Sequence, residues 1–281
     1  MFEEVVVGIR GDDEAGRDAI ALANELVCPQ ADLTLLHVHV VAVKPAPDSG
    51  SVGDAAKCRY AGERLTALAG EFAIAAEVSC VEARSVRRGL HEFASARHAD
   101  LLVVSASHND ELARDFVGDD TRELLQDPPC AVAVASAGYA ARAAAMRRIG
   151  VAYDGSAESE QALALARRLA VELHAELSAF EAVRAPLYVR DVSDVQREDE
   201  EHVEEARQRL AALGGLKAEA ASGDSVEELV RYGQSVDLLV IGSHKYRRID
   251  HLWQQSTAQQ LADVASSPLL VLPSAAPAEA S

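Results

Sequence analysis

The residues with the clearest chemical potential follow an apolar run, in the stretch DLLVIGSHKYRRIDHLWQQSTAQQL that begins at Asp237. Gly242 and Ser243 end a predicted buried strand, and Ser256 begins a predicted helix. Such turns and helix starts bind phosphate in many α/β proteins. A tight phosphate cradle favours glycine, because backbone without Cβ lets several N–H groups approach one anion. Lys245 follows instead, so the stretch is either a phosphate site or the remains of one.

The other histidines, motifs and cysteines of the sequence do not indicate a catalytic or metal site. His37 and His39 alternate on a predicted strand and point to opposite faces, so they cannot chelate one metal together. No Gly-x-Ser-x-Gly, Walker lysine or metalloprotease motif is present. The cysteines show no CxxC spacing, and we expect buried thiols: Cys28, Cys58, Cys80 and Cys130. The sequence predicts neither catalytic residues nor a metal site.

The elements that position these residues occur twice. VVVGIRGDDEAGRDAIALANELVCPQADLTLLHV, from Val5, aligns without gaps with IGVAYDGSAESEQALALARRLAVELHAELSAFEA, from Ile149. The segment ADLLVVSASHNDELARDFVGDDTRELLQDPPCAVAVA, from Ala99, aligns in the same way with the segment from Val236. Similarity over such lengths indicates an internal duplication.

Each copy alternates apolar strands with Ala/Leu-rich helices, which predicts a parallel sheet with helices on both faces. Strands such as DLLVV and DLLVI are apolar throughout, as strands buried on both faces require. We therefore expect an α/β fold of two tandem, doubly wound, five-stranded parallel-sheet domains of Rossmann-like type. The predicted limits are residues 1–137 and 149–273 for the domains, 138–148 for a linker and 274–281 for a flexible tail.

Both copies resemble the universal stress protein family over nearly the whole chain. In the second copy, VAYDGSAESEQALALA resembles the family's opening strand, turn and helix, SGDSVEELV its turn before the third helix, and DLLVIGSH its fourth strand. The resemblance implies a fold similar to that of the adenine nucleotide alpha hydrolases. The family's nucleotide fingerprint is Gly, two residues, Gly, nine residues, Gly, then Ser or Thr. Its positions fall on Gly242, Lys245, Gln255 and Ser256 in the second copy, and on Ser105, His108, Gly118 and Asp119 in the first.

The fingerprint has decayed differently in the two copies. In nucleotide-binding members of the family, an Asp at the end of the first strand faces the adenosine. The second copy resembles them in having Asp154 at this position, whereas the first copy has Arg10. Asp119 stands where a hydroxyl normally meets phosphate, and two like charges ~4 Å apart at an effective dielectric of ~20 repel by about 4 kcal/mol. We therefore expect nucleotide in the second copy only. The candidate cofactor-binding residues are Asp154, Gly242, Lys245 and Ser256.

Two interpretations of the basic run KYRR in the second copy stay open. In the first, its charges replace backbone amides at a phosphate, with Ser256 donating from the helix start and Asp154 on the sugar or base. In the second, the run is a solvated loop, and the side chains of Lys245 and Gln255 fill the cleft.

Charge and hydropathy limit the partners and the cellular location to be expected. The formal net charge of −18 disfavours nucleic acid and anionic membranes as partners. The start MFEEVVVGIR lacks the basic residues of a signal peptide, and no apolar run approaches ~18 residues, so we expect a cytoplasmic protein. The two domains are expected to pair about a pseudo-two-fold axis through their final strands, CAVAVA and PLLVL, with a homodimer of chains as a further option.

The resemblance implies a tandem universal stress protein that binds or regulates without turnover, with ATP or AMP in the second domain or with no cofactor. One alternative is an adenylating enzyme of the broader adenine-nucleotide-binding α/β group, which needs a phosphate cradle and a reactive partner. The other is a structural interaction protein with both clefts closed.

Overall fold

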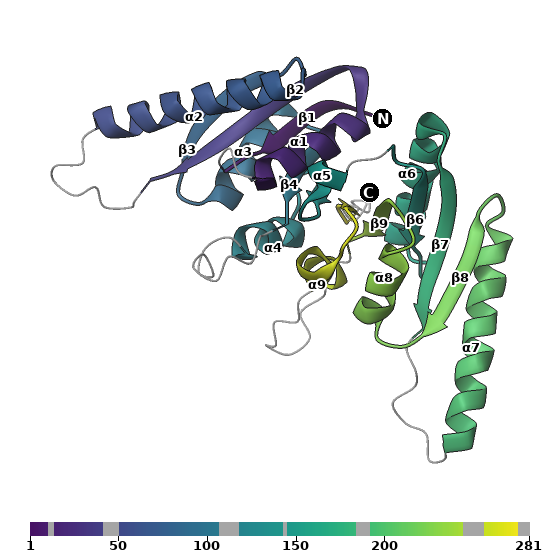
Figure 1. Cartoon of the computed structure of the whole chain (residues 1–281). Coiled ribbons are helices and arrows are strands. Elements are labelled where there is room, and N and C mark those ends of the chain that lie inside the picture. Colours follow the sequence, from purple (N-terminus) through teal and green to yellow (C-terminus); the bar gives the residue numbers. More distant parts are fainter. Residues whose placement is uncertain are drawn as a thin grey trace, which may run out of the picture. The chain divides into compact units, whose positions relative to one another are not determined.

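A computed structural model describes residues 1–10, 14–41, 51–106, 118–142, 145–183, 192–243 and 256–274 (Figure 1). The chain divides into two compact units, Met1–Ala145 and Met146–Ser281. Strands and helices alternate in both units, which confirms the α/β prediction.

The first unit has five parallel strands in the order β3-β2-β1-β4-β5. Neighbouring strands are in register, with Val7 opposite Leu35 on one side and opposite Val103 on the other. Its elements are β1 (Phe2–Gly8), α1 (Glu14–Leu26), β2 (Val27–Val40), α2 (Ser51–Glu71), β3 (Glu77–Ala83), α3 (Val86–Arg97), β4 (Leu101–Ser105), α4 (Gly118–Gln126), β5 (Ala131–Ala135) and α5 (Tyr139–Arg142).

The second unit repeats this plan, with five parallel strands in the order β8-β7-β6-β9-β10. Val151 of β6 pairs with Ala179 of β7 and Val240 of β9. Its elements are β6 (Arg148–Ala152), α6 (Ala157–Leu173), β7 (Glu176–Val183), α7 (Val192–Ala212), β8 (Lys217–Ser222), α8 (Ser225–Gly233), β9 (Leu238–Gly242), α9 (Thr257–Val264) and β10 (Leu269–Leu272).

Local sequence explains where these elements begin and end. The central strands β4 and β9 are continuous apolar runs whose apolar side chains are all buried, as parallel strands with helices on both faces require. Helix α6 begins after Ser156, whose hydroxyl accepts from the backbone N–H of Ser159. Glu158 and Glu160 in its first turn suit the positive end of the helix dipole. The start of α6 is thereby fixed beside the carboxyl end of β6.

The predicted linker begins as an ordered part of the first unit. The buried carboxylate of Asp18 in α1 accepts hydrogen bonds from the backbone N–H groups of Gly138 (2.7 Å) and Ala140 (2.8 Å). These bonds attach α5 to α1. The two units divide between Ala145 and Met146, inside the predicted 138–148 segment, and the exact linker limits stay a prediction.

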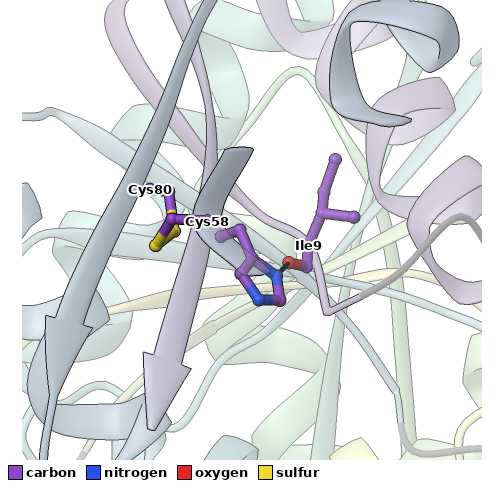
Figure 2. The surroundings of a disulfide bond; sticks show 4 residues. Ile9, Cys58 and Cys80 are labelled. Atoms are coloured by element: carbon purple, nitrogen blue, oxygen red, sulfur yellow. Dashed lines mark hydrogen bonds between the residues drawn. A yellow bond between two sulfur atoms is a disulfide. The ribbon is translucent and has the colours of Figure 1, made fainter. Parts of the chain in front are cut away.

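The expectation that all cysteines are buried thiols is wrong for one pair. Cys58 of α2 and Cys80 of β3 form a disulfide, shown in Figure 2. They are separated by 22 residues, and the missing CxxC spacing gave no hint that helix and strand bring them together. Cys130 is a buried free thiol whose pKa is raised to about 12 by burial, and Cys28 is free and half-buried.

Candidate ligand-binding site

The second unit contains a cavity of about 460 Å³ at the carboxyl ends of its strands. Open α/β sheets generally bind ligands at this edge. The cavity combines apolar and aromatic side chains with hydroxyls and one carboxylate. Its lining residues are Ala152, Tyr153, Asp154, Ser159, Phe180, Ala182, Ser225, Leu229, Ile241, Gly242, Ser256, Thr257 and Ala258.

Asp154, Gly242 and Ser256, three of the four predicted site residues, therefore line one cavity. The fourth, Lys245, lies outside the described residues, as do Gln255 and His108. Asp119 lies in the first turn of α4. The structure thus brings together predicted residues from three separate segments.

The Asp154 carboxylate is held in place by the chain that follows β6. Its Oδ1 accepts from the backbone N–H of Ser156 at 3.0 Å. Ser156 in turn caps α6, so the carboxylate and the helix start are oriented together. An acceptor fixed in this way can receive hydrogen bonds from ligand hydroxyl or amino groups.

Aromatic side chains form a rigid part of the wall. Phe180 of β7 stacks on Tyr232 of α8, with ring centroids 4.7 Å apart. Tyr232 is buried against Gly150, where a Cβ would come within 2.7 Å of the ring. Burial raises the pKa of Tyr232 to about 12, so its hydroxyl stays neutral at physiological pH. The face that Phe180 offers to the cavity is fixed by this stack.

Tyr153 contributes its ring to the cavity, while its hydroxyl donates to Glu160 of α6. Burial and this hydrogen bond raise the pKa of Tyr153 to about 12. The phenol is therefore a neutral donor at physiological pH and has the wrong protonation state for a general base.

Gly242 has a structural reason to be glycine. A Cβ at this position would lie 2.7 Å from the backbone C and O atoms of Glu158 at the start of α6. Backbone atoms cannot move aside as the end of a flexible side chain can. Close packing of β9 against α6 thus explains Gly242 without any ligand.

Ser256 is already engaged in a capping box. Its hydroxyl accepts from the backbone N–H of Gln259 at 3.3 Å, and its own N–H donates to Oε1 of Gln259 at 2.8 Å. The reciprocal bonds satisfy two donors at the start of α9 that would otherwise be available to an anion. This helix start is consequently a weaker phosphate site than its position suggests.

The corresponding cavity of the first unit is much smaller, about 80 Å³. Leu90 lines it, as the equivalent Leu229 lines the larger cavity, and its Cδ2 is only 2.7 Å from the point where Gly8 would carry a Cβ. Two valines also line it: Val38 occupies the position of Ala182, and Val86 that of Ser225. Bulky aliphatic side chains, in addition to the lost fingerprint, distinguish this cleft from the second.

The lining residues that differ most in size between the two cavities were not identified from the sequence. Val38 and Ala182 stand at equivalent places of the aligned repeats, as do Val86 and Ser225 after the capping residues Ser85 and Asp224. A position-by-position comparison of side-chain volumes would have found them. The capping role of Gln259 was also signalled, because a Ser followed three residues later by Gln is a capping-box pattern.

No group of three or more metal-ligating side chains occurs in the part of the chain that the structure describes. Within the same residues, no helix is long and apolar enough to cross a membrane.

The fold defines a tandem α/β protein of Rossmann-like type. The model of the universal stress protein family matches residues 1–136 and again residues 146–273. The chain therefore belongs to the universal stress protein family and is a tandem member of it.

Solved structures agree with this assignment at the level of the fold. A universal stress protein from Archaeoglobus fulgidus DSM 4304 is 12% identical, with 96% of this chain and 98% of that chain covered and a TM-score of 0.66. A protein of unknown function from Pseudomonas aeruginosa PAO1 is 18% identical, with coverages of 97% and 93% and a TM-score of 0.65. The cytoplasmic domain of a prokaryotic cation chloride cotransporter is 14% identical, with coverages of 97% and 96% and a TM-score of 0.53. A comparison with curated protein sequences finds no match.

Proposed function

We propose that this tandem universal stress protein is a cytoplasmic binding or regulatory module that takes one adenine nucleotide or nucleoside, in its second domain, without turnover. The difference between the two cavities carries the proposal. A volume of about 460 Å³ lies within the usual range for small-molecule sites, whereas about 80 Å³ is far below it.

The lining of the larger cavity suits such a ligand. Apolar side chains around Phe180 offer a surface on which a flat base can pack, and the Asp154 carboxylate can accept from sugar hydroxyls. Because the capping box already uses two helix-start donors, phosphate contributes less to affinity here than at an open helix start. We expect AMP or adenosine to bind at least as well as ATP.

The absence of turnover is part of the proposal. Adenylation requires a positioned reactive group as well as phosphate binding. Tyr153, whose pKa of about 12 keeps it neutral at physiological pH, is a poor candidate for a base. Pyrophosphate release from ATP by the purified chain would favour the adenylating enzyme instead.

The pairing of the two domains within one chain is also proposed. Two copies of one domain carry the same surface twice, which permits a closed pair about an approximate two-fold axis. Further association of chains into a homodimer stays a prediction, and light scattering of the purified chain measures it.

The test exchanges the size-determining residues. In the variant Ala182→Val with Ser225→Val, the second cleft acquires the valines of the first, and nucleotide binding should fall at least tenfold. Isothermal titration with ATP, AMP and cyclic AMP measures affinity and stoichiometry. The matched control is Val38→Ala in the first cleft, which should leave both values unchanged. Binding that resists the double substitution would contradict the proposed location.

A further inference from the structure

The disulfide Cys58–Cys80 joins two elements at the edge of the first unit's sheet. Cys58 lies in α2 and Cys80 lies in β3, with their Cα atoms 5.6 Å apart. Within the first unit, β3 is the outermost strand and pairs with β2. The bond, shown in Figure 2, therefore attaches helix α2 to the edge strand β3.

The two halves of α2 are held to the sheet in different ways. In the C-terminal half, Leu65, Leu68 and Ala69 are buried. None of the side chains of residues 55–64 is buried. At Gly62 a Cβ would stand 4.0 Å from Val78 of β3, so the helix passes close to the strand, but glycine offers no side chain to bury. Since apolar burial scales with area, this half gains little from packing, and the disulfide is its strongest attachment.

Both residues of the disulfide are partly exposed. Cys58 and Cys80 each have intermediate exposure, in contrast to the buried thiol of Cys130. Thiol–disulfide exchange requires that a small thiol reach one of the sulfur atoms. In the cytoplasm, the location proposed above, disulfides are usually transient and redox-sensing. The place of the bond at a sheet edge, the partial exposure of its cysteines and the proposed cytoplasmic location together favour a disulfide that forms and breaks.

We propose that Cys58 and Cys80 are a reversible redox pair that fastens the N-terminal half of α2 to β3 when oxidised and releases it when reduced. Release affects the covered face of an edge strand, because β3 loses the helix segment that lies over Cys80 and Val78. The C-terminal half of α2 stays packed through its buried leucines. Redox state thus changes one edge of the first unit and leaves its core intact.

A small-molecule disulfide such as oxidised glutathione accepts the two electrons when the thiols of Cys58 and Cys80 are oxidised. The thiolate of one cysteine attacks that disulfide, forms a mixed disulfide and releases one glutathione thiolate. The second cysteine then loses its proton and attacks the protein sulfur, which releases the second glutathione. Two electrons pass from the cysteine pair to the acceptor, and the two thiol protons end on the two glutathione molecules.

The experiment uses the full chain equilibrated in glutathione buffers that range from fully reduced to fully oxidised. Trapping with acid and alkylation with a mass tag give the fraction of the Cys58–Cys80 bond, and amide hydrogen exchange gives the order of α2. The bond should form and break within the glutathione range. On reduction, amide exchange over residues 55–64 should accelerate about tenfold or more, while residues 101–105 of β4 stay protected.

Cysteine variants distinguish a bond that holds the N-terminal half of α2 from one that holds nothing or the whole unit. Cys58→Ser with Cys80→Ser should exchange over 55–64 like the reduced chain at every ratio, and the control Cys28→Ser should keep the full response. The reduced wild-type chain supplies the same comparison if the double variant fails to fold. A bond that never forms, or that no glutathione ratio reduces, would overturn the proposal. So would unchanged exchange over 55–64 on reduction, or equal acceleration of β4, since the bond would then hold either nothing or the whole unit.

Discussion

Gly242→Ala tests whether this glycine is kept by packing or by a ligand. The added Cβ would stand 2.7 Å from the backbone C and O of Glu158, in contact with atoms that cannot rotate away. Overpacking of this kind costs about 1–3 kcal/mol. With an m-value of ~2 kcal/mol/M in urea, a loss of about 2 kcal/mol lowers the unfolding midpoint of the second domain by about 1 M.

Urea unfolding followed by far-UV circular dichroism is the assay, with separate transitions fitted if the two domains unfold independently. The matched control is Gly70→Ala in α2, where an added Cβ meets nothing within 4 Å. Gly70 is the next-to-last residue of α2, so its replacement should raise stability by less than the roughly 0.5–1 kcal/mol expected in the middle of a helix. Opposite signs for the two substitutions are expected. An unchanged midpoint for Gly242→Ala, combined with lost nucleotide binding, would refute the packing argument.

Two further predictions concern polar groups. Gln259→Ala removes the acceptor of the Ser256 N–H, so it should lower the free energy of unfolding in urea by about 1 kcal/mol. Because the substitution frees a helix-start donor, it should also raise the affinity for AMP. A fall in AMP affinity, or an equal rise in the neighbouring control Gln260→Ala, would contradict this prediction. Partial burial of Asp237 opposes its ionisation, but hydrogen bonds from the Arg148 side chain and nearby backbone N–H groups outweigh it and lower its pKa. Its stabilising effect is therefore complete above the unfolded pKa of about 3.9 and is lost as pH falls through the lower folded value. Asp237→Asn should be less stable than wild type at neutral pH, and this difference should shrink below about pH 4; a constant difference would show that Asp237 acts without its charge.

The fold was predictable because its signals are repeated and redundant. DLLVV and DLLVI, apolar throughout and placed equivalently in the two repeats, become the buried central strands β4 and β9. The disulfide was not predictable from spacing. Cys58 and Cys80 meet because α2 crosses over β3, and the place where a helix passes a strand is a property of packing.

The candidate site was predictable in part. Asp154, Gly242 and Ser256 were identified from the resemblance to the universal stress protein family, and they line one cavity. The sequence did not show why each residue type stands at its position. Gly242 packs closely against the backbone of Glu158, which leaves no room for a Cβ, and Ser256 caps helix α9. The two cavities differ in volume, and the equivalent lining positions Val38 and Ala182 are residues of ordinary strand type that gave no signal of a site.

The most direct test of the central claim is to find where an adenine nucleotide attaches. Photolabelling of the full chain with 8-azido-AMP, followed by peptide mass mapping, locates the bound base, and competition with unmodified AMP identifies specific labelling. The account predicts labelled peptides within residues 146–273, near the walls that carry Tyr153 and Phe180. Competable labelling within residues 1–136, or equally in both domains, would contradict it.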